Sequence, residues 1–170
     1  DGYMDDIHAT RDAVGADMVA LIRAGDSTYC GIGYLNNSLS ASSAFSISRY
    51  NCSIGYYSFA HELGHNKGSQ HDPLNAGGSA LFSYSYGYQD PGAQFRTVMA
   101  YNCPGGCTRY QYFSNPDVIF PGTSKPLGVA GVNDNARSIN YAAPIAAGWR
   151  AGAATTVPNS PSGGGTEGVT

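Results

Sequence analysis

The stretch from Ser58 to Asp72, Ser-Phe-Ala-His-Glu-Leu-Gly-His-Asn-Lys-Gly-Ser-Gln-His-Asp, constrains this chain more than any other part of its sequence. His61 and His65 are four residues apart, and on an α-helix this spacing places two imidazoles one turn apart on the same face. Gly68 lets the chain leave such a helix through a left-handed conformation. The turn would bring His71 back beside the other two histidines, as a third ligand for one metal ion. Three neutral imidazoles with one open coordination position are typical of a catalytic zinc site.

The order His-Glu-x-x-His-x-x-Gly-x-x-His in this stretch resembles the long zinc signature of the metzincin metallopeptidases. A coincidental match in a core helix is the alternative, because short His-Glu-x-x-His runs also occur in unrelated proteins. The extended pattern favours the metzincin interpretation, since it contains three of the four histidines of the chain. Asp72, directly after the third histidine, resembles the reprolysin (adamalysin-like) branch of the family.

A second motif, Thr97-Val-Met-Ala-Tyr101, resembles the metzincin Met-turn. The resemblance implies that Met99 forms an apolar floor beneath the zinc ligands. The alternative is that Met99 is an ordinary core methionine. The Met-x-Tyr pattern is similar to that of astacins and serralysins, which implies that Tyr101 ligates zinc or stabilises the transition state. Tyr101 could instead be a buried structural residue.

The composition limits the classes of partner. Charged residues make up only 12% of the chain and the net charge is −3, so a basic nucleic-acid-binding surface is not expected. No apolar run approaches the length that crosses a membrane. No Asp-rich, Gly-containing loop indicates calcium. We expect a secreted, extracellular monomer that acts on protein or peptide substrates.

The four cysteines lie outside the zinc motif. Cys103 and Cys107 enclose Pro-Gly-Gly, a sequence that turns sharply, so we expect them to form one disulfide. Cys30 and Cys52 would then form the second. The alternative, that Cys103 and Cys107 are half of a metal-binding knuckle, lacks a second pair with matching spacing. Two disulfides favour an oxidising compartment.

Four elements are expected before the zinc helix, which we place over residues 56–67. Periodicity predicts a helix over residues 3–14 that ends at Gly15. The apolar run 18–22 predicts a strand buried on both faces. Residues 30–35 form a strand-like segment that the resemblance implies is the antiparallel edge of the sheet, where an extended peptide could add. Residues 44–50 alternate as in a half-buried strand.

The segments after the Met-turn are also interpreted from the resemblance. Residues 108–117 resemble the segment that walls the pocket for the residue after the scissile bond. Because it contains Tyr110, Tyr112 and Phe113, we expect an apolar residue at that position of the substrate. Asp134 or Asn133 is expected to cap a helix that runs to Arg150, with a kink at Pro144. Residues 151–170 lack periodicity and read as a flexible linker or tail.

The fold class expected is α+β (mixed α/β), with a twisted mixed sheet, an active-site helix, a Met-turn and a C-terminal helix, as in the metzincin-like zincin fold. The catalytic domain would cover residues 1–150. Members of the family have more strands before the zinc helix than this chain has. We therefore expect the N-terminal part of the catalytic domain to be missing from this chain. The alternative is a compact variant whose sheet is complete with three strands.

The resemblance implies a zinc-dependent endopeptidase. One zinc ion would be held by His61, His65 and His71. Zinc lowers the pKa of its water, and Glu62 would act as general base towards that water. Two alternatives remain, which are a zinc hydrolase of a non-peptide amide and a non-catalytic zinc-binding module. Glu62 argues against the second, since such a module would be expected to have lost its general base.

Overall fold

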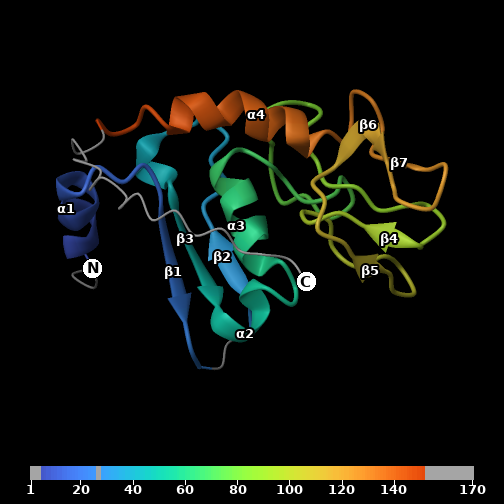
Figure 1. The fold of residues 1–170 in the computed structure, drawn as a ribbon, viewed down its shortest axis with the longest axis horizontal. Helices are drawn as coiled ribbons and strands as arrows, with labels where there is room; N and C mark the ends of the chain where they lie inside the picture. The colour runs from blue at the N-terminus through green and yellow to red at the C-terminus, as the bar shows by residue number, and fades with distance from the viewer. Residues whose placement is uncertain (1–4, 26–27, 152–170) are drawn as a thin grey trace, which may run out of the picture.

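The computed structural model of the chain describes residues 5–25 and 28–151 (Figure 1). Its N-terminal part contains α1 (Asp6–Ala13), β1 (Val19–Arg23), β2 (Gly31–Gly33), the 3-10 helix η1 (Ala41–Ser43), β3 (Phe45–Arg49), α2 (Tyr50–Ser53) and α3 (Ser58–Asn66). Its C-terminal part contains β4 (Phe95–Arg96), β5 (Thr108–Arg109), β6 (Asn115–Ile119), β7 (Pro126–Leu127) and α4 (Asn135–Ala146). The mixed α/β class expected from the sequence is confirmed.

The first three strands form one mixed sheet in the order β1-β3-β2. β1 and β3 are parallel, with Leu21 opposite Ile47, whereas β2 runs antiparallel to β3 and places Ile32 opposite Ile47. β2 therefore is an antiparallel edge strand, as expected. Figure 1 shows α3 packed along this sheet, while α4 runs from the region of β6 back across the end of the sheet.

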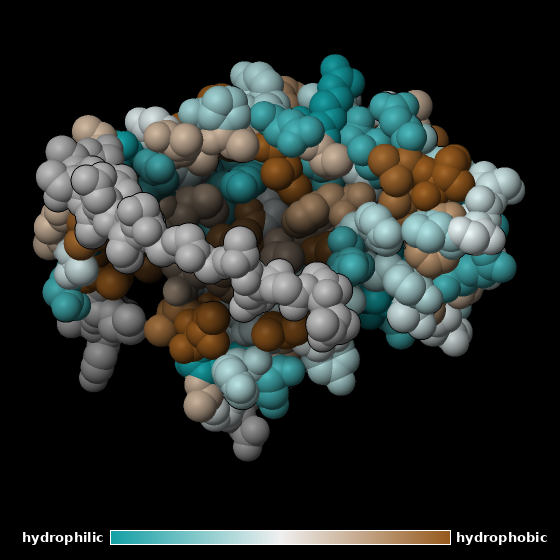
Figure 2. Space-filling model, in the orientation of Figure 1, coloured by the Kyte–Doolittle hydropathy of each residue, from teal (hydrophilic) through white to brown (hydrophobic). Residues whose placement is uncertain are grey.

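The expectation that the strand at residues 18–22 is buried on both faces is wrong. β1 is the other edge of the sheet, and its three central residues are exposed, with Leu21 at 37% and Ile22 at 51%. An apolar run shows that a strand has hydrophobic side chains, but its place in the sheet depends on which other segments pair with it. Figure 2 shows hydrophobic surface at the lower end of this sheet.

The expected helices are present with shorter bounds. α1 ends before Gly15, which has a left-handed φ of +64°, and α3 occupies the centre of the range expected for the zinc helix. The N-cap of α4 is Asp134, whose side chain accepts a hydrogen bond from the backbone N–H of Arg137, and Pro144 lies inside the helix. The linker expected over residues 151–170 falls, apart from residue 151, outside the described residues and stays a prediction.

α1 is attached to the rest of the molecule by a polar side chain. Arg11 is 2% exposed and donates hydrogen bonds to the backbone oxygens of Ala16, Asp17 and Ala41. Val14, the C-cap residue of α1, is 59% exposed and therefore does not help to anchor the helix.

The hydrophobic core of the C-terminal part is aromatic. Tyr88, Phe95 and Leu127 are buried together, and Tyr112 and Phe120 pack against them. The rings of Phe95 and Phe120 stack with their centroids 4.2 Å apart. This core includes residues of β4 and β7 and contacts Tyr112, in the segment that follows the Met-turn.

Candidate active site

The zinc helix, α3, ends as the sequence predicts. Gly68 has a φ of +79° and its N–H donates to the carbonyl of His65, while the N–H of Ser69 donates to the carbonyl of Gly64. These two hydrogen bonds form a Schellman motif, which requires a residue that tolerates the left-handed conformation. The turn directs the chain back toward the helix and brings His71 beside the two helical histidines.

Three histidine side chains converge at this turn. The Nε2 atom of His71 lies 3.2 Å from that of His61 and 3.0 Å from that of His65. Ligand nitrogens about 3.3 Å apart are expected around a tetrahedral zinc with bonds of roughly 2.0–2.1 Å. Among the described residues, the potential ligand atoms of these three histidines all lie within 4.8 Å of one another. The residues present therefore fit a zinc ion.

Hydrogen bonds orient the three rings. The Nδ1 atoms lie 2.9, 2.8 and 3.3 Å from backbone oxygens of Val98, Ser69 and Asn75, in the order His61, His65, His71. A carbonyl oxygen only accepts, so each Nδ1 carries the proton and each Nε2 presents a lone pair toward the other two. Three lone pairs that face one another at this separation repel unless a cation lies between them.

The three imidazoles are held neutral. Burial and the nearby His65 lower the pKa of His61 well below its usual value. Burial and His71 lower the pKa of His65 to about 4, and burial also lowers the pKa of His71. Because only neutral imidazole offers a lone pair to a metal, all three side chains are available as ligands at neutral pH.

Glu62 lies on α3 between these ligands and packs against β2. Its side chain is buried, and a Cβ atom added at Gly31 would lie 2.7 Å from its Cγ atom. A Cβ atom at Gly33 would lie 3.0 Å from its backbone oxygen. The two glycines of β2 therefore leave the space that α3 occupies. Burial raises the pKa of Glu62 to about 7, although the charge of Arg109 opposes this shift.

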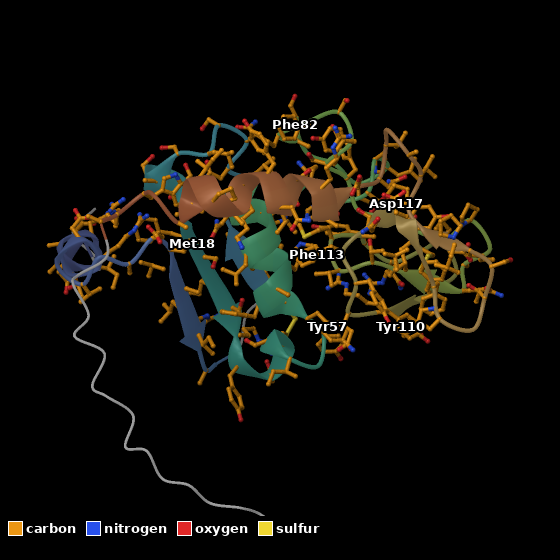
Figure 3. All side chains as sticks on the ribbon, turned by 45° about the horizontal axis from the view of Figure 1, so that its top comes forward. Met18, Tyr57, Phe82, Tyr110, Phe113 and Asp117 are labelled. Atoms are coloured by element: carbon orange, nitrogen blue, oxygen red, sulfur yellow. A yellow bond between two sulfur atoms is a disulfide. The ribbon has the colours of Figure 1, made fainter. Side chains whose placement is uncertain are left out.

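The expected Met-turn lies directly beneath the helix. Met99 is fully buried, and a Cβ atom at Gly64 would lie 2.5 Å from its sulfur. Gly64 therefore leaves the space into which the methionine packs, between the turns that carry His61 and His65. Phe113 contacts the same glycine position, and Figure 3 shows it beside α3. The position expected for Met99 is confirmed.

Tyr101 and Asp72 connect the Met-turn to the third histidine. The ring of Tyr101, which is 45% exposed, lies 4.2 Å from the ring of His71 between centroids. Asp72 is buried and accepts hydrogen bonds from the backbone N–H of Tyr101 and the side chain of Asn75. The sequence pointed to Asp72 only as a mark of a subfamily, whereas the structure gives its carboxylate this connecting position.

Sequence reasoning missed the position of Arg109. Its guanidinium donates to the backbone oxygens of Tyr56, just before α3, and of Ala100, in the Met-turn. The only signal in the sequence was a single cation in the aromatic segment 108–113, which did not indicate where the side chain points.

Both expected disulfides are present, joining Cys30 to Cys52 and Cys103 to Cys107. The first links the start of β2 to α2, and the second closes the loop between the Met-turn and β5. They therefore hold the two segments that flank α3 on either side of the site.

Comparisons with known proteins agree with this geometry. The family model described as Metallo-peptidase family M12B Reprolysin-like matches residues 1–72, which end just after His71. A peptidyl-Asp metalloendopeptidase of Stenotrophomonas maltophilia (strain R551-3) is 41% identical over 151 residues, covering 86% of this chain and 35% of that protein. A protein of the same name from Xanthomonas campestris pv. campestris is 43% identical over 148 residues, covering 86% of this chain and 34% of that protein. These similarities support a metzincin-type family for the chain.

The chain spans about a third of the length of the curated relatives it matches. A more distant protein of the same name, from Pseudomonas aeruginosa, is 30% identical over 179 residues, covering 88% of this chain and 29% of that protein. No solved structure matches the chain significantly. Every helix in the part that the structure describes is too short or too polar to cross a lipid bilayer.

Proposed function

We propose that this metzincin domain is a zinc-dependent endopeptidase in which Glu62 is the general base. The observation that carries the proposal is the convergence of three unprotonated Nε2 atoms on one point beside a buried carboxyl group. The names of the relatives support it, because each describes a metalloendopeptidase.

His61, His65 and His71 would hold the zinc through Nε2. When bound, zinc would supply Lewis-acid chemistry and lower the pKa of a bound water toward about 7. Glu62 accepts the proton of the attacking water and donates it to the leaving amine nitrogen. Its raised pKa, about 7, suits both transfers, because a group that titrates near the working pH can hold and release a proton.

Tyr101 is proposed as the group that stabilises the oxyanion formed when the peptide carbonyl is attacked. Its ring lies against His71 and almost half of its surface is exposed, which leaves it accessible to a substrate. A phenolic hydroxyl donates one hydrogen bond, as an oxyanion requires.

The proposed substrate is an extended peptide that adds to the free edge of β2. Within the part of the chain that the structure describes, β2 pairs with β3 alone, and its glycines keep it close to Glu62. Pairing with an edge strand uses backbone hydrogen bonds and therefore accepts many sequences. For the residue after the scissile bond we infer aspartate, following the peptidyl-Asp named for the relatives. This differs from the apolar residue expected from the sequence.

The proposed setting is extracellular, and the two disulfides support it because such bonds persist in oxidising compartments. A zinc hydrolase of a non-peptide amide would need the same metal chemistry, but the free strand edge beside the site favours a peptide. A non-catalytic zinc module would have no use for a buried carboxyl group that is not hydrogen-bonded to the histidines.

Hydrolysis of a denatured protein by wild type and Glu62→Gln tests the proposal, with zinc measured in both. We expect one zinc per chain in each protein, and a fall in turnover of about 100- to 10,000-fold in the variant, because general-base catalysis contributes about this much. Loss of zinc together with activity would refute the role of Glu62. Zinc-loaded wild type that cleaves no peptide but hydrolyses a small amide would favour the non-peptide hydrolase.

A further inference from the structure

Arg109 lies between the segment that precedes α3 and the Met-turn. Its Nη1 donates to the oxygen of Tyr56 at 3.0 Å, and its Nη2 donates to the oxygen of Ala100 at 3.1 Å. The guanidinium thus spans from Tyr56, two residues before α3, to the Met-turn. Figure 3 shows the same junction, with Tyr57 at the start of α3 and Tyr110 directly after β5.

The hydrogen-bonding capacity of Arg109 is incompletely used. Its Nε is buried, and no acceptor in the described part of the chain lies within hydrogen-bonding reach of it. A guanidinium has five N–H donors in a planar fork that matches a carboxylate. The ion pairs found within residues 5–25 and 28–151 join other cations to Asp90 and Asp12, so no carboxylate of this region pairs with Arg109.

The surroundings of Arg109 leave its charge poorly compensated. Burial, together with the neighbouring Arg96, lowers the pKa of Arg109 to about 10, against the opposing effects of Glu62 and Tyr101. Arg96 lies opposite it in the register of β4 and β5 and donates to the same oxygen, that of Ala100, at 2.8 Å. Arg109 is half-buried, and a partly desolvated charge without a carboxylate partner is costly, so an anion from outside the chain would be stabilised at this point.

The location of the segment that carries Arg109 indicates which part of a substrate could supply this anion. β5 begins the stretch 108–117, which resembles the wall of the pocket for the residue after the scissile bond. The charge of Arg109 acts on Glu62, His61 and His71, so the guanidinium lies close to the reacting groups. The aromatic residues of the wall would enclose the stem of a side chain while Arg109 contacts its end.

We propose that Arg109 is the specificity-determining residue of this site, binding the carboxylate of an acidic side chain that directly follows the scissile bond. This inference rests on the proposed peptidase function. The short stem of aspartate keeps its carboxylate near the peptide backbone, and hence near β2 and Glu62. Asparagine has the same shape but no charge, so the comparison of aspartate with asparagine isolates the contribution of the cation.

The test uses zinc-loaded protein and three peptides that differ only in the residue after the cut, which is Asp, Asn or Leu. Wild type should cleave the Asp peptide with a kcat/KM about 10- to 100-fold above that of the Asn peptide, the range expected for a hydrogen bond to a charged group. Arg109→Gln should lose this preference, chiefly through a higher KM for the Asp peptide. Arg109→Lys should keep part of it.

Arg96→Gln is the matched control, because Arg96 also donates to Ala100 but lies in β4 rather than in the proposed wall. It should keep the preference for Asp over Asn. An unchanged preference in Arg109→Gln would overturn the inference, as would equal cleavage of the Asp and Asn peptides by wild type. Wild-type behaviour therefore decides the question even if Arg109→Gln does not fold.

If the proposed peptidase function is wrong, the cleavage assay gives a different result. In that case wild type cleaves none of the three peptides, including the Leu peptide. Binding of the Asp and Asn peptides to Glu62→Gln then tests Arg109 without turnover. Tighter binding of the Asp peptide, reduced when Arg109→Gln is added, supports the inference, and equal binding of the two peptides contradicts it.

Discussion

At the scale of single residues, the candidate site depends on glycines that leave space for the side chains of Glu62 and Met99. Gly31 and Gly33 border Glu62, and Gly64 receives the sulfur of Met99. None of the three has a left-handed φ, so their role is steric rather than conformational. Each allows an element of the site to approach α3 more closely than a side chain would permit.

Gly31→Ala should therefore displace the Glu62 side chain and lower kcat/KM by about 100-fold, within the range that general-base catalysis contributes. Zinc content should not change, because no metal ligand borders Gly31 among the described residues. Peptide hydrolysis and metal analysis measure the two quantities. Gly77→Ala serves as the control, since nothing lies within 4 Å of a Cβ atom there. A fully active Gly31→Ala protein would show that the carboxyl group is not held by this contact.

At the scale of elements, α3 is joined to the sheet mainly through polar groups. The buried residues of α3 are Ser58, His61, Glu62, Gly64, His65 and Asn66, whereas its apolar residues Phe59, Ala60 and Leu63 are only half-buried. The strand face toward α3 carries small residues, including Gly31, Gly33 and the buried Ser48. This close contact between helix and sheet positions the three histidines relative to β2.

Asn66 should be an important anchor of this contact. It is fully buried, and its Nδ2 lies 3.0 to 3.2 Å from the backbone oxygens of Tyr34, Ser43 and Phe45. Asn66→Ala leaves these buried oxygens without that donor, and we expect the free energy of unfolding to fall by about 2 kcal/mol. Urea denaturation measures the change.

Asn37→Ala is the control for this prediction. Asn37 also donates from Nδ2 to a backbone oxygen, that of Ser79 at 3.1 Å, but it is exposed. Its loss should change the free energy of unfolding by less than about 0.5 kcal/mol, as is usual for surface positions. Equal losses in the two variants would mean that the buried contacts of Asn66 do not contribute as we infer.

At the scale of the whole molecule, the segment after α4 returns to the N-terminal part. The indole N–H of Trp149 donates to the oxygen of Leu39, and the backbone N–H of Arg150 donates to the Asp17 side chain. Arg150 also pairs with Asp12 at 2.5 Å. These contacts join residues that are 110 or more positions apart, so the two parts should unfold together.

Trp149 is the only tryptophan of the sequence and reports on this contact. We expect its fluorescence and the far-UV circular dichroism to change at the same urea concentration, as two-state unfolding requires. Trp149→Phe removes the hydrogen bond and should lower the free energy of unfolding by about 1 kcal/mol. A fluorescence transition at clearly lower urea than the dichroism transition would show that the C-terminal segment detaches independently.

The sequence by itself determined the features that depend on short spacing along the chain. The four-residue interval of His61 and His65, and the glycine turn that returns His71, bring three ligands together within eleven residues, because helix geometry and a left-handed glycine leave few alternatives. The Cys103–Cys107 disulfide and the cap at Asp134 were predictable for the same reason, since each depends on neighbouring residues.

Only the tertiary structure decided the features that depend on distant pairings. β1 is apolar yet lies at an edge, because its exposure is set by strand order and not by its own residues. Gly31 leaves space for α3, and Arg109 reaches the segment just before that helix. Both contacts arise because residues 31 and 47 positions away from Glu62 in the sequence fold against the region of α3. A local pattern specifies which side chains an element presents, but the partner that they meet is determined by packing across the whole chain.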